Sequence, residues 1–443
     1  MSSSDRWERN QLRKSILGMS VAAGLSCLAA MPVPAGALRA GVGKVAITST
    51  PDEFPYQAPG ERPYVGIHDE VYARALLLDD GQRRIALAVV EVTKLPDPAG
   101  LVKQIAHEAG VPETNVLVAA THTHNVPLVF FHEKEPNALQ AREIERLTRG
   151  TLEAVRQAKA RMQPAKIAFG RAQAWINVNN GEQAGLKPYD PRGPSDKSLD
   201  VVRVAKPDGT SLALLVNYAS HAEVMFRSAT RDGGYEVSGD LPGAVARLLE
   251  GQPGAAPVVL YTAAAEGDQV TQFKSLQPAG RLPEADEGAA GWSLLDVQAR
   301  RLSESVMGVL TNMSEGDLQA HIEAAATEVT CPGQRLHRDP NTGQFTSEDT
   351  PPVSIPLSVI RINDIALAGV GGDVASAIGE HFKASSPLTH STLISMANGG
   401  LGYLLTDASY EHPNHGVMGS PVKPHCAEEA IVGGLVGLIK PTL

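Results

Sequence analysis

The chain has 443 residues, of which 43% are apolar and 20% are charged, and its net charge is -10. These values are ordinary for a globular protein and exclude disorder as the main state. A negative chain without a long basic run is not expected to bind nucleic acid, or to bind anionic lipid through charge. After the first forty residues, no stretch of about 18 uninterrupted apolar residues occurs, so we predict no membrane span in the mature chain.

The first 37 residues are predicted to be a secretory signal peptide. Four basic residues come first: Arg6, Arg9, Arg13 and Lys14. A short apolar stretch over 16–31 follows, and Ala35-Gly36-Ala37 offers a small-residue cleavage site. The alternative is an uncleaved anchor, whereas Cys27 fits a lipid-attachment site poorly. We therefore expect a secreted or periplasmic protein whose mature domain covers 38–443.

Strand and helix patterns then alternate along the mature chain. Apolar, β-branched runs bounded by turn residues predict strands over 44–47, 71–78, 84–92, 115–119, 165–169, 199–204, 211–217, 258–262, 354–360, 365–370 and 392–396. Patterns with a period near 3.6 predict helices over 99–109, 141–160, 242–249, 295–312 and 375–383. Short Asp-Gly turns add antiparallel pairs. The fold class predicted is α/β, a mixed β-sheet flanked by helices in a single large catalytic domain.

Four polar stretches rich in Gly and Pro are predicted to be long loops, over about 180–198, 271–293, 331–353 and 405–425. Residues of loops this long would be expected to line a substrate pocket. Removal of the signal leaves Cys331 and Cys426. In an exported protein they form either one disulfide or two buried thiols, and the sequence leaves both open.

The most informative string is Thr121-His122-Thr123-His124, which follows the predicted strand 115–119. Residues two apart in a strand face the same side, and ligands of α/β sheets bind at strand ends. Imidazole is a favoured zinc ligand, so the pattern suits a metal ion. The alternative is a pair of ordinary histidines at a strand terminus.

Other strand ends carry polar residues as well. His221 ends the string that begins with strand 211–217, and Gly-Asp pairs place Asp240, Asp268 and Asp373 after apolar runs or turns. Such a carboxylate can serve a site, although it more often caps the next helix. No Gly-x-Ser-x-Gly elbow, His-Glu-x-x-His helix or phosphate-binding glycine loop competes with these residues.

Taken together, the strings resemble the catalytic domain of the neutral (non-lysosomal) ceramidases, zinc amidohydrolases that cleave N-acyl sphingoid lipids. The resemblance begins at Ala40-Gly41-Val42-Gly43-Lys44 and includes Gly66-Ile67-His68-Asp69-Glu70-Val71-Tyr72. It continues through Thr-His-Thr-His and Ser220-His221 to about residue 424. Larger family members carry an additional C-terminal immunoglobulin-like domain, so the chain resembles a short form with the catalytic domain alone.

The resemblance implies a Zn2+ site held by His122, His221, Asp373 and Tyr403. Asp373 stands where the family has Glu in a Gly-Glu pair, and Tyr403 lies in the family's Gly-Tyr-x-x-Thr string. The resemblance places His124 beside the reaction centre as a proton-handling group, and makes Tyr403 or His124 a donor to the oxyanion.

Two further carboxylates, Asp240 and Asp268, are predicted to orient the imidazoles, with turn and cap duty as the alternative.

Three departures from the family pattern fall on the substrate side. The family's Ser after Gly-Asp-Val is absent from Gly267-Asp268-Gln269-Val270-Thr271. Asn180 stands where the family has an Arg after an Asn, and a substrate-side Tyr is lost near His415. We therefore expect zinc-dependent hydrolysis of an N-acyl amide, with ceramide (N-acylsphingosine) as the substrate that the resemblance implies. The alternatives are a smaller non-sphingolipid N-acyl amide or ester, or a non-catalytic exported binding protein of the same fold.

Overall fold

The computed structural model describes residues 36–57, 62–127, 136–181, 189–276, 286–339, 345–411 and 415–439. Residues 1–35 of the predicted signal peptide lie outside this range. The elements below all belong to the compact unit 35–443. In the described part of the chain, no helix combines the length and the apolar character that crossing a bilayer requires.

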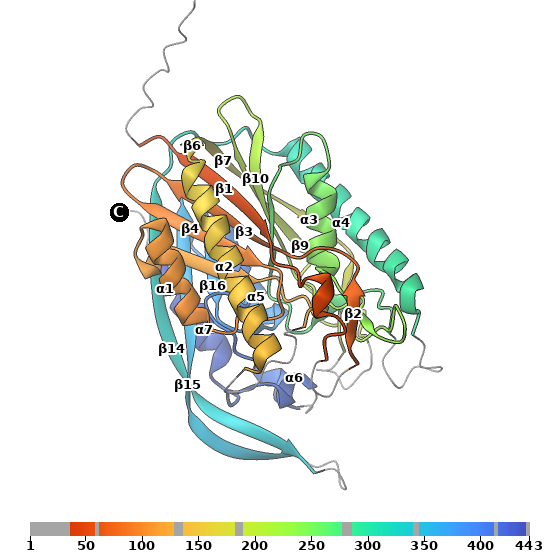
Figure 1. Cartoon of the computed structure of the whole chain (residues 1–443). Coiled ribbons are helices and arrows are strands. Elements are labelled where there is room, and N and C mark those ends of the chain that lie inside the picture. Colours follow the sequence, from red (N-terminus) through yellow and green to blue (C-terminus); the bar gives the residue numbers. More distant parts are fainter. Residues whose placement is uncertain are drawn as a thin grey trace, which may run out of the picture. The chain divides into compact units, whose positions relative to one another are not determined.

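The first sheet has five strands in the order β5-β4-β3-β1-β6. They are β1 (Arg39–Ala46), β3 (Tyr72–Asp79), β4 (Arg84–Val90), β5 (Val116–Ala120) and β6 (Gln163–Pro164). β4 and β5 are parallel, and the other neighbours are antiparallel. Two helices, α1 (Pro98–Ala109) and α2 (Ala138–Ala160), cover its outer face (Figure 1).

The second sheet has the order β12-β10-β9-β7. Its strands are β7 (Lys166–Gln173), β9 (Ser198–Ala205), β10 (Ser211–Tyr218) and β12 (Val259–Ala263). β10 and β12 are parallel, and the remaining pairs are antiparallel. The outer face packs against α3 (Asp240–Glu250) and α4 (Gly291–Asn312).

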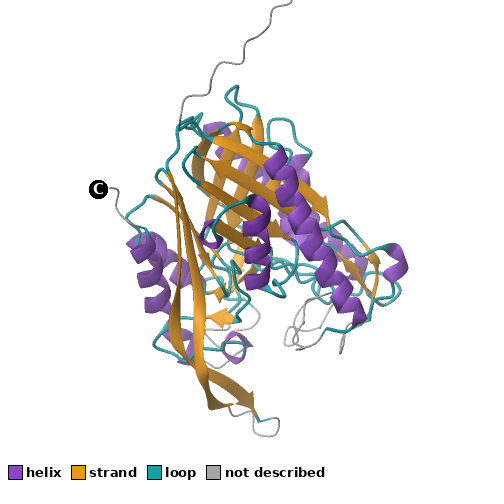
Figure 2. Ribbon diagram, turned by 60° about the vertical axis from the view of Figure 1, so that its left-hand side comes forward, coloured by secondary structure: helices purple, strands orange, loops and turns teal. Residues whose placement is uncertain are grey.

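The third sheet has the order β14-β15-β16-β18. It consists of β14 (Ile322–Arg338), β15 (Phe345–Ile362), β16 (Ile365–Val370) and β18 (His390–Ile394). α5 (Ser376–Ser385) and α7 (Ala427–Leu438) pack on it. The far end of the β14–β15 hairpin projects beyond the sheet (Figure 2).

Short elements lie between the sheets and the helices. Three two-stranded ladders join β2 (Tyr64–Ile67) to β11 (Tyr235–Val237), β8 (Asn177–Asn179) to β13 (Gln269–Thr271), and β17 (Asp373–Val374) to β19 (Tyr403–Leu404). One short helix, α6 (His415–Met418), precedes α7.

One core cluster joins the inner faces of all three sheets. It contains Leu87 and Leu117 from the first sheet, Leu215 and Leu260 from the second, and Leu367 from the third, all almost fully buried. Full burial of such a side chain contributes roughly 1.5–3 kcal/mol. The sheets are therefore held face to face by apolar packing, with the helices outside.

The predicted α/β class with a mixed sheet and flanking helices is confirmed, although the strands divide over several sheets. The prediction of a loop over 331–353 was wrong, because most of that stretch belongs to the hairpin of β14 and β15. Side chains over 345–354 are almost all exposed or half-buried on both faces. No alternation of apolar and polar residues marks this part as a strand, and cross-strand pairing holds it instead.

Cys331 and Cys426 form a disulfide, which decides between the two alternatives that the sequence left open. The bond joins β14 to the residue before α7 across 95 positions of the chain. Closing so long a loop restricts the unfolded chain and so favours the folded state.

Close packing of β1 on α2 depends on glycine. A Cβ at Gly43 would lie 2.0 Å from the carbonyl oxygen of Ala154 in α2, so Gly43→Ala must displace the helix. We expect a loss of about 1–3 kcal/mol in the free energy of unfolding, measured by urea denaturation. Gly308→Ala is the control, because a Cβ at this position of α4 meets nothing within 4 Å. Equal stabilities of the two variants would contradict the role assigned to Gly43.

Candidate metal centre

His122 and His124 lie just beyond the end of β5. The strand stops at Ala120, and His122 has a φ of 61°, a left-handed conformation that non-glycine residues rarely adopt. The amide of His124 donates to the carbonyl oxygen of Ala222 at 3.0 Å. We had predicted that the two imidazoles converge through the alternation of side chains along a strand. They converge instead through the turn that follows β5.

His221 follows β10 and is held by backbone carbonyl groups. Its Nδ1 lies 2.9 Å from the oxygen of Glu266 and 3.1 Å from that of Gln269. With Nδ1 donating there, the other ring nitrogen, Nε2, keeps its lone pair. Nε2 lies 3.2 Å from Oδ2 of Asp373.

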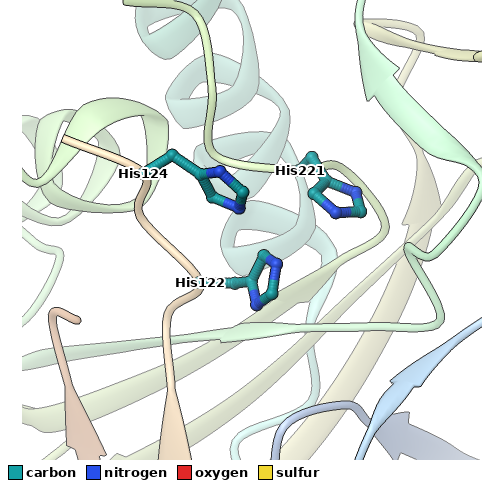
Figure 3. Close-up of side chains that lie close together, drawn as sticks. All are labelled: His122, His124 and His221. Carbon is teal, nitrogen blue, oxygen red and sulfur yellow. The ribbon is translucent and has the colours of Figure 1, made fainter. Parts of the chain in front are cut away.

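The three imidazoles form one cluster (Figure 3). One ring nitrogen from each of His122, His124 and His221 can be chosen so that all lie within 4.8 Å of one another. Nδ1 of His122 and both ring nitrogens of His124 are buried without a hydrogen-bond partner in the described structure. Buried polar groups are almost always satisfied, so nitrogens without partners indicate that a ligand belongs here.

Asp373 and Tyr403 reach the same place from the two-stranded ladder of β17 and β19. They are neighbours in the parallel ladder of β17 and β19. Oδ2 of Asp373 also lies 4.0 Å from Nε2 of His122, and its Oδ1 is buried without a partner in the described structure. The Tyr403 ring lies 6.1 Å from the His221 ring between centroids. The structure thus brings together all five residues predicted for the centre.

This donor set fits zinc, which takes imidazole nitrogen and carboxylate oxygen as ligands. Burial lowers the pKa of His122 and of His124 well below the ordinary value, so both rings are neutral and can use a lone pair. Burial disfavours the charged form of His221, but the Asp373 carboxylate, together with Glu266 and Glu223, outweighs it and raises the pKa of His221 well above the ordinary value. The pocket around Nε2 of His221 thus stabilises positive charge, as a cation site does.

Two acidic residues that we did not predict also lie at the centre. Glu266 follows β12, its side chain is fully buried, and neither carboxylate oxygen has a hydrogen-bond partner among the described residues. Burial, with Asp373 and Glu223 nearby, raises the pKa of Glu266 well above the ordinary value. Glu223 is paired with Lys274. Glu266 stands directly before Gly267-Asp268, and that place at a strand end was the one signal that could have found it.

Asp240 and Asp268 accept hydrogen bonds from backbone amides and a hydroxyl around the centre, which agrees with the alternative of turn and cap duty. Asp240 accepts hydrogen bonds from the amides of Val224, Met225 and Leu241, and so shapes the loop after His221. Burial raises the pKa of Asp240 to about 6. The His221 ring is held by two backbone carbonyl groups. A sequence motif does not reveal contacts of this kind.

Asp268 ties the turn after β12 to the start of α5. Oδ1 accepts from the amide of Ser376 at 2.9 Å and Oδ2 accepts from its hydroxyl at 3.0 Å. In addition, the amide of Gly267 donates to the oxygen of Val374 at 2.8 Å. These bonds fix the chain directly after Asp373.

The two predicted substrate-side residues lie at different distances from the cluster. The amide of Asn180 donates to the oxygen of Asp268 at 2.9 Å, which places it behind the turn after β12. His415 opens α6, is exposed, and has its ring 5.9 Å from the Tyr403 ring. His415 thus stands beside a predicted ligand.

Replacing Asp268 by Asn should loosen the support of Asp373. Asn has an NH2 group in place of one carboxylate oxygen. Either the amide or the hydroxyl of Ser376 therefore loses its acceptor. We expect the free energy of unfolding to fall by about 1–3 kcal/mol, measured by chemical denaturation. Asp208→Asn is the control, because Asp208 lies in an exposed turn and Asn can still accept from the amide of Thr210. A loss no larger than that of the control would remove Asp268 from the support of the centre.

Comparisons with known proteins agree with the resemblance seen in the sequence. Neutral ceramidase from Pseudomonas aeruginosa is 29% identical over 171 residues, which cover 34% of this chain and 25% of that protein. The match thus spans about a quarter of the relative's length.

Two solved structures have a similar fold. One is the crystal structure of neutral ceramidase from Pseudomonas aeruginosa, with a TM-score of 0.69, and the other is a ceramidase complexed with C2, with a TM-score of 0.71. Each is 16% identical in sequence, and each match covers 91% of this chain and 74% of the other.

The family model described as neutral/alkaline non-lysosomal ceramidase, N-terminal, matches residues 39–335. This range is more than half of the chain and contains the three clustered histidines. The family predicted from the sequence motifs is therefore confirmed. The chain belongs to the neutral/alkaline non-lysosomal ceramidase family.

Proposed function

We propose that this protein is a zinc-dependent amidohydrolase that cleaves N-acyl sphingoid lipids of the ceramide type. The observation that carries the proposal is the cluster of three imidazoles with an adjacent carboxylate, whose inward nitrogens lack protein partners. His122, His221, Asp373 and Tyr403 would hold the ion. Family membership supplies the class of reaction and of substrate.

When bound, zinc polarises a carbonyl group and lowers the pKa of water toward about 7. The residues of the chain supply the rest of the reaction. His124 is neutral because it is buried, so it accepts a proton from the attacking water and returns it to the leaving amine. Tyr403 lies beside the His221 ring and donates a hydrogen bond to the developing oxyanion.

A smaller or more polar N-acyl substrate is a second candidate, favoured by the side chain of Gln269. It occupies part of the string in which the family has Val and Ser, and it is tied to Ser195, Pro194, Asp268 and Ser376. A turnover assay with N-acylsphingosine and a soluble N-acyl amine, each followed by mass spectrometry, distinguishes the two substrates.

Substitution of the histidines tests metal binding and proton transfer separately. We expect His122→Ala to lose both bound zinc and turnover. His124→Asn should keep zinc and lose about 10²–10⁴-fold in kcat, since it removes only the proton-handling group. Zinc is measured by elemental analysis on the sample used for the assay. Loss of zinc in His124→Asn would make His124 a ligand, and full turnover of zinc-free protein would refute the proposed chemistry.

We also propose that the protein is exported and cleaved after Ala37. The basic start, the apolar stretch and the Ala35-Gly36-Ala37 site support export, and the Cys331–Cys426 disulfide suits an oxidising compartment. N-terminal analysis of protein recovered outside the cytoplasm should give Leu38 as the first residue. Recovery of the intact chain from the cytoplasm alone would contradict this.

A further inference from the structure

We propose that Glu266 is an additional ligand of the cation held by His221 and Asp373, so that the centre of this chain uses two carboxylates. The inference rests on the proposed function in one respect, the binding of a divalent ion. It adds a residue that neither the sequence motifs nor the comparisons assign.

The position of Glu266 places it between the two residues that it would join. Its backbone oxygen accepts from Nδ1 of His221 at 2.9 Å, and the next residue, Gly267, donates to Val374, the neighbour of Asp373. The turn after β12 is thus bonded on one side to His221 and on the other to β17. Its side chain lies within electrostatic reach of His221 and Asp373.

The carboxylate of Glu266 has no other partner to explain its burial. Its side chain is fully buried, and neither oxygen has a hydrogen-bond partner among the described residues. Asp240 and Asp268, also buried, each accept several hydrogen bonds. Buried carboxylates in proteins are paired, hydrogen-bonded or bound to metal. In the ion-free chain the raised pKa keeps the Glu266 carboxyl protonated, and a bound metal is the arrangement that would satisfy its charged form.

The charges around His221 point to a divalent ion in particular. Three carboxylates act on this imidazole: Asp373, Glu266 and Glu223. Lys274 pairs with Glu223, whereas no lysine or arginine of the described residues forms an ion pair with Asp373 or Glu266. With an ion bound, these two carboxylates would balance the two positive charges of one divalent cation. Asp373 is also one methylene shorter than the Glu of the family pattern, so a second carboxylate has room to contribute.

The test uses Glu266→Gln in the full chain, because Gln keeps the shape and removes the charge. We expect the Kd for zinc, measured by competition with a chelator, to rise at least about tenfold. We also expect the visible absorption bands of the cobalt-substituted protein to shift, since these bands depend on the ligand set. Glu266→Asp serves as a second variant if Glu266→Gln does not fold, and should likewise weaken zinc binding and shift the bands.

Glu143→Gln is the matched control. Glu143 is a buried carboxylate of α2 that is bonded to Ser49 and Arg146, and its loss should leave zinc affinity and the cobalt bands unchanged. Wild-type affinity and wild-type bands in Glu266→Gln, or in Glu266→Asp where that variant is used, would overturn the inference and leave the proposed function standing. A wild-type chain that binds no divalent ion would overturn both.

Discussion

The centre depends on one short segment, 395–398, that bonds the ends of all three sheets together. The amide of Ser395 donates to Ala263 at the end of β12, and that of Ala397 donates to Val370 at the end of β16. Asn398 pairs with β5 through its side chain, which accepts from the amide of Val118 and donates to the oxygen of Val116. Strand ends expose unpaired backbone groups, and this segment satisfies them while it fixes their spacing. Residues from β5, β10, β12 and β16 can therefore meet at one point.

The groups gathered at that point are costly to bury. An isolated carboxylate in a protein interior is destabilised by roughly several kcal/mol, even after the surroundings relax. Asp373 and Glu266 are both buried; burial lowers the pKa of His122 and His124, and nearby carboxylates raise the pKa of His221. The protein tolerates this because the apolar cluster between the sheets stabilises the fold independently of the site. The shared core provides most of the stability, so the residues that follow the strand ends can form a polar site.

The sequence predicted the elements with strong periodic patterns and missed those without them. Strand 365–370 was predicted with the bounds that the structure has, and helix 99–109 was one residue short. The far end of the β14–β15 hairpin was missed because its side chains are exposed on both faces. α7 was missed because it is apolar almost all round and its sequence shows little periodicity. Gly434 in this helix allows close contact with Leu357 of β15.

The structure places the predicted site residues near one another, and their roles stay proposals. His122, His124, His221, Asp373 and Tyr403 do lie together, as the resemblance implied. The motifs did not show which carboxylate of a turn is left without a protein partner. Glu266 and Asp268 are two residues apart, and the conformation of the turn decides that Asp268 accepts from the amide of Ser376 while the buried carboxyl of Glu266 has no hydrogen-bond partner among the described residues.

The support of His221 by two backbone carbonyls has a consequence for behaviour in acid. In many metal proteins a carboxylate orients the imidazole, and its hold weakens once it takes up a proton. A peptide oxygen does not titrate, so the ring of His221 keeps its tautomer and direction wherever the fold itself survives. Any decline of the proposed activity at low pH must then begin with protons that compete at the ligand atoms of the site, and not with a His221 ring that has turned away.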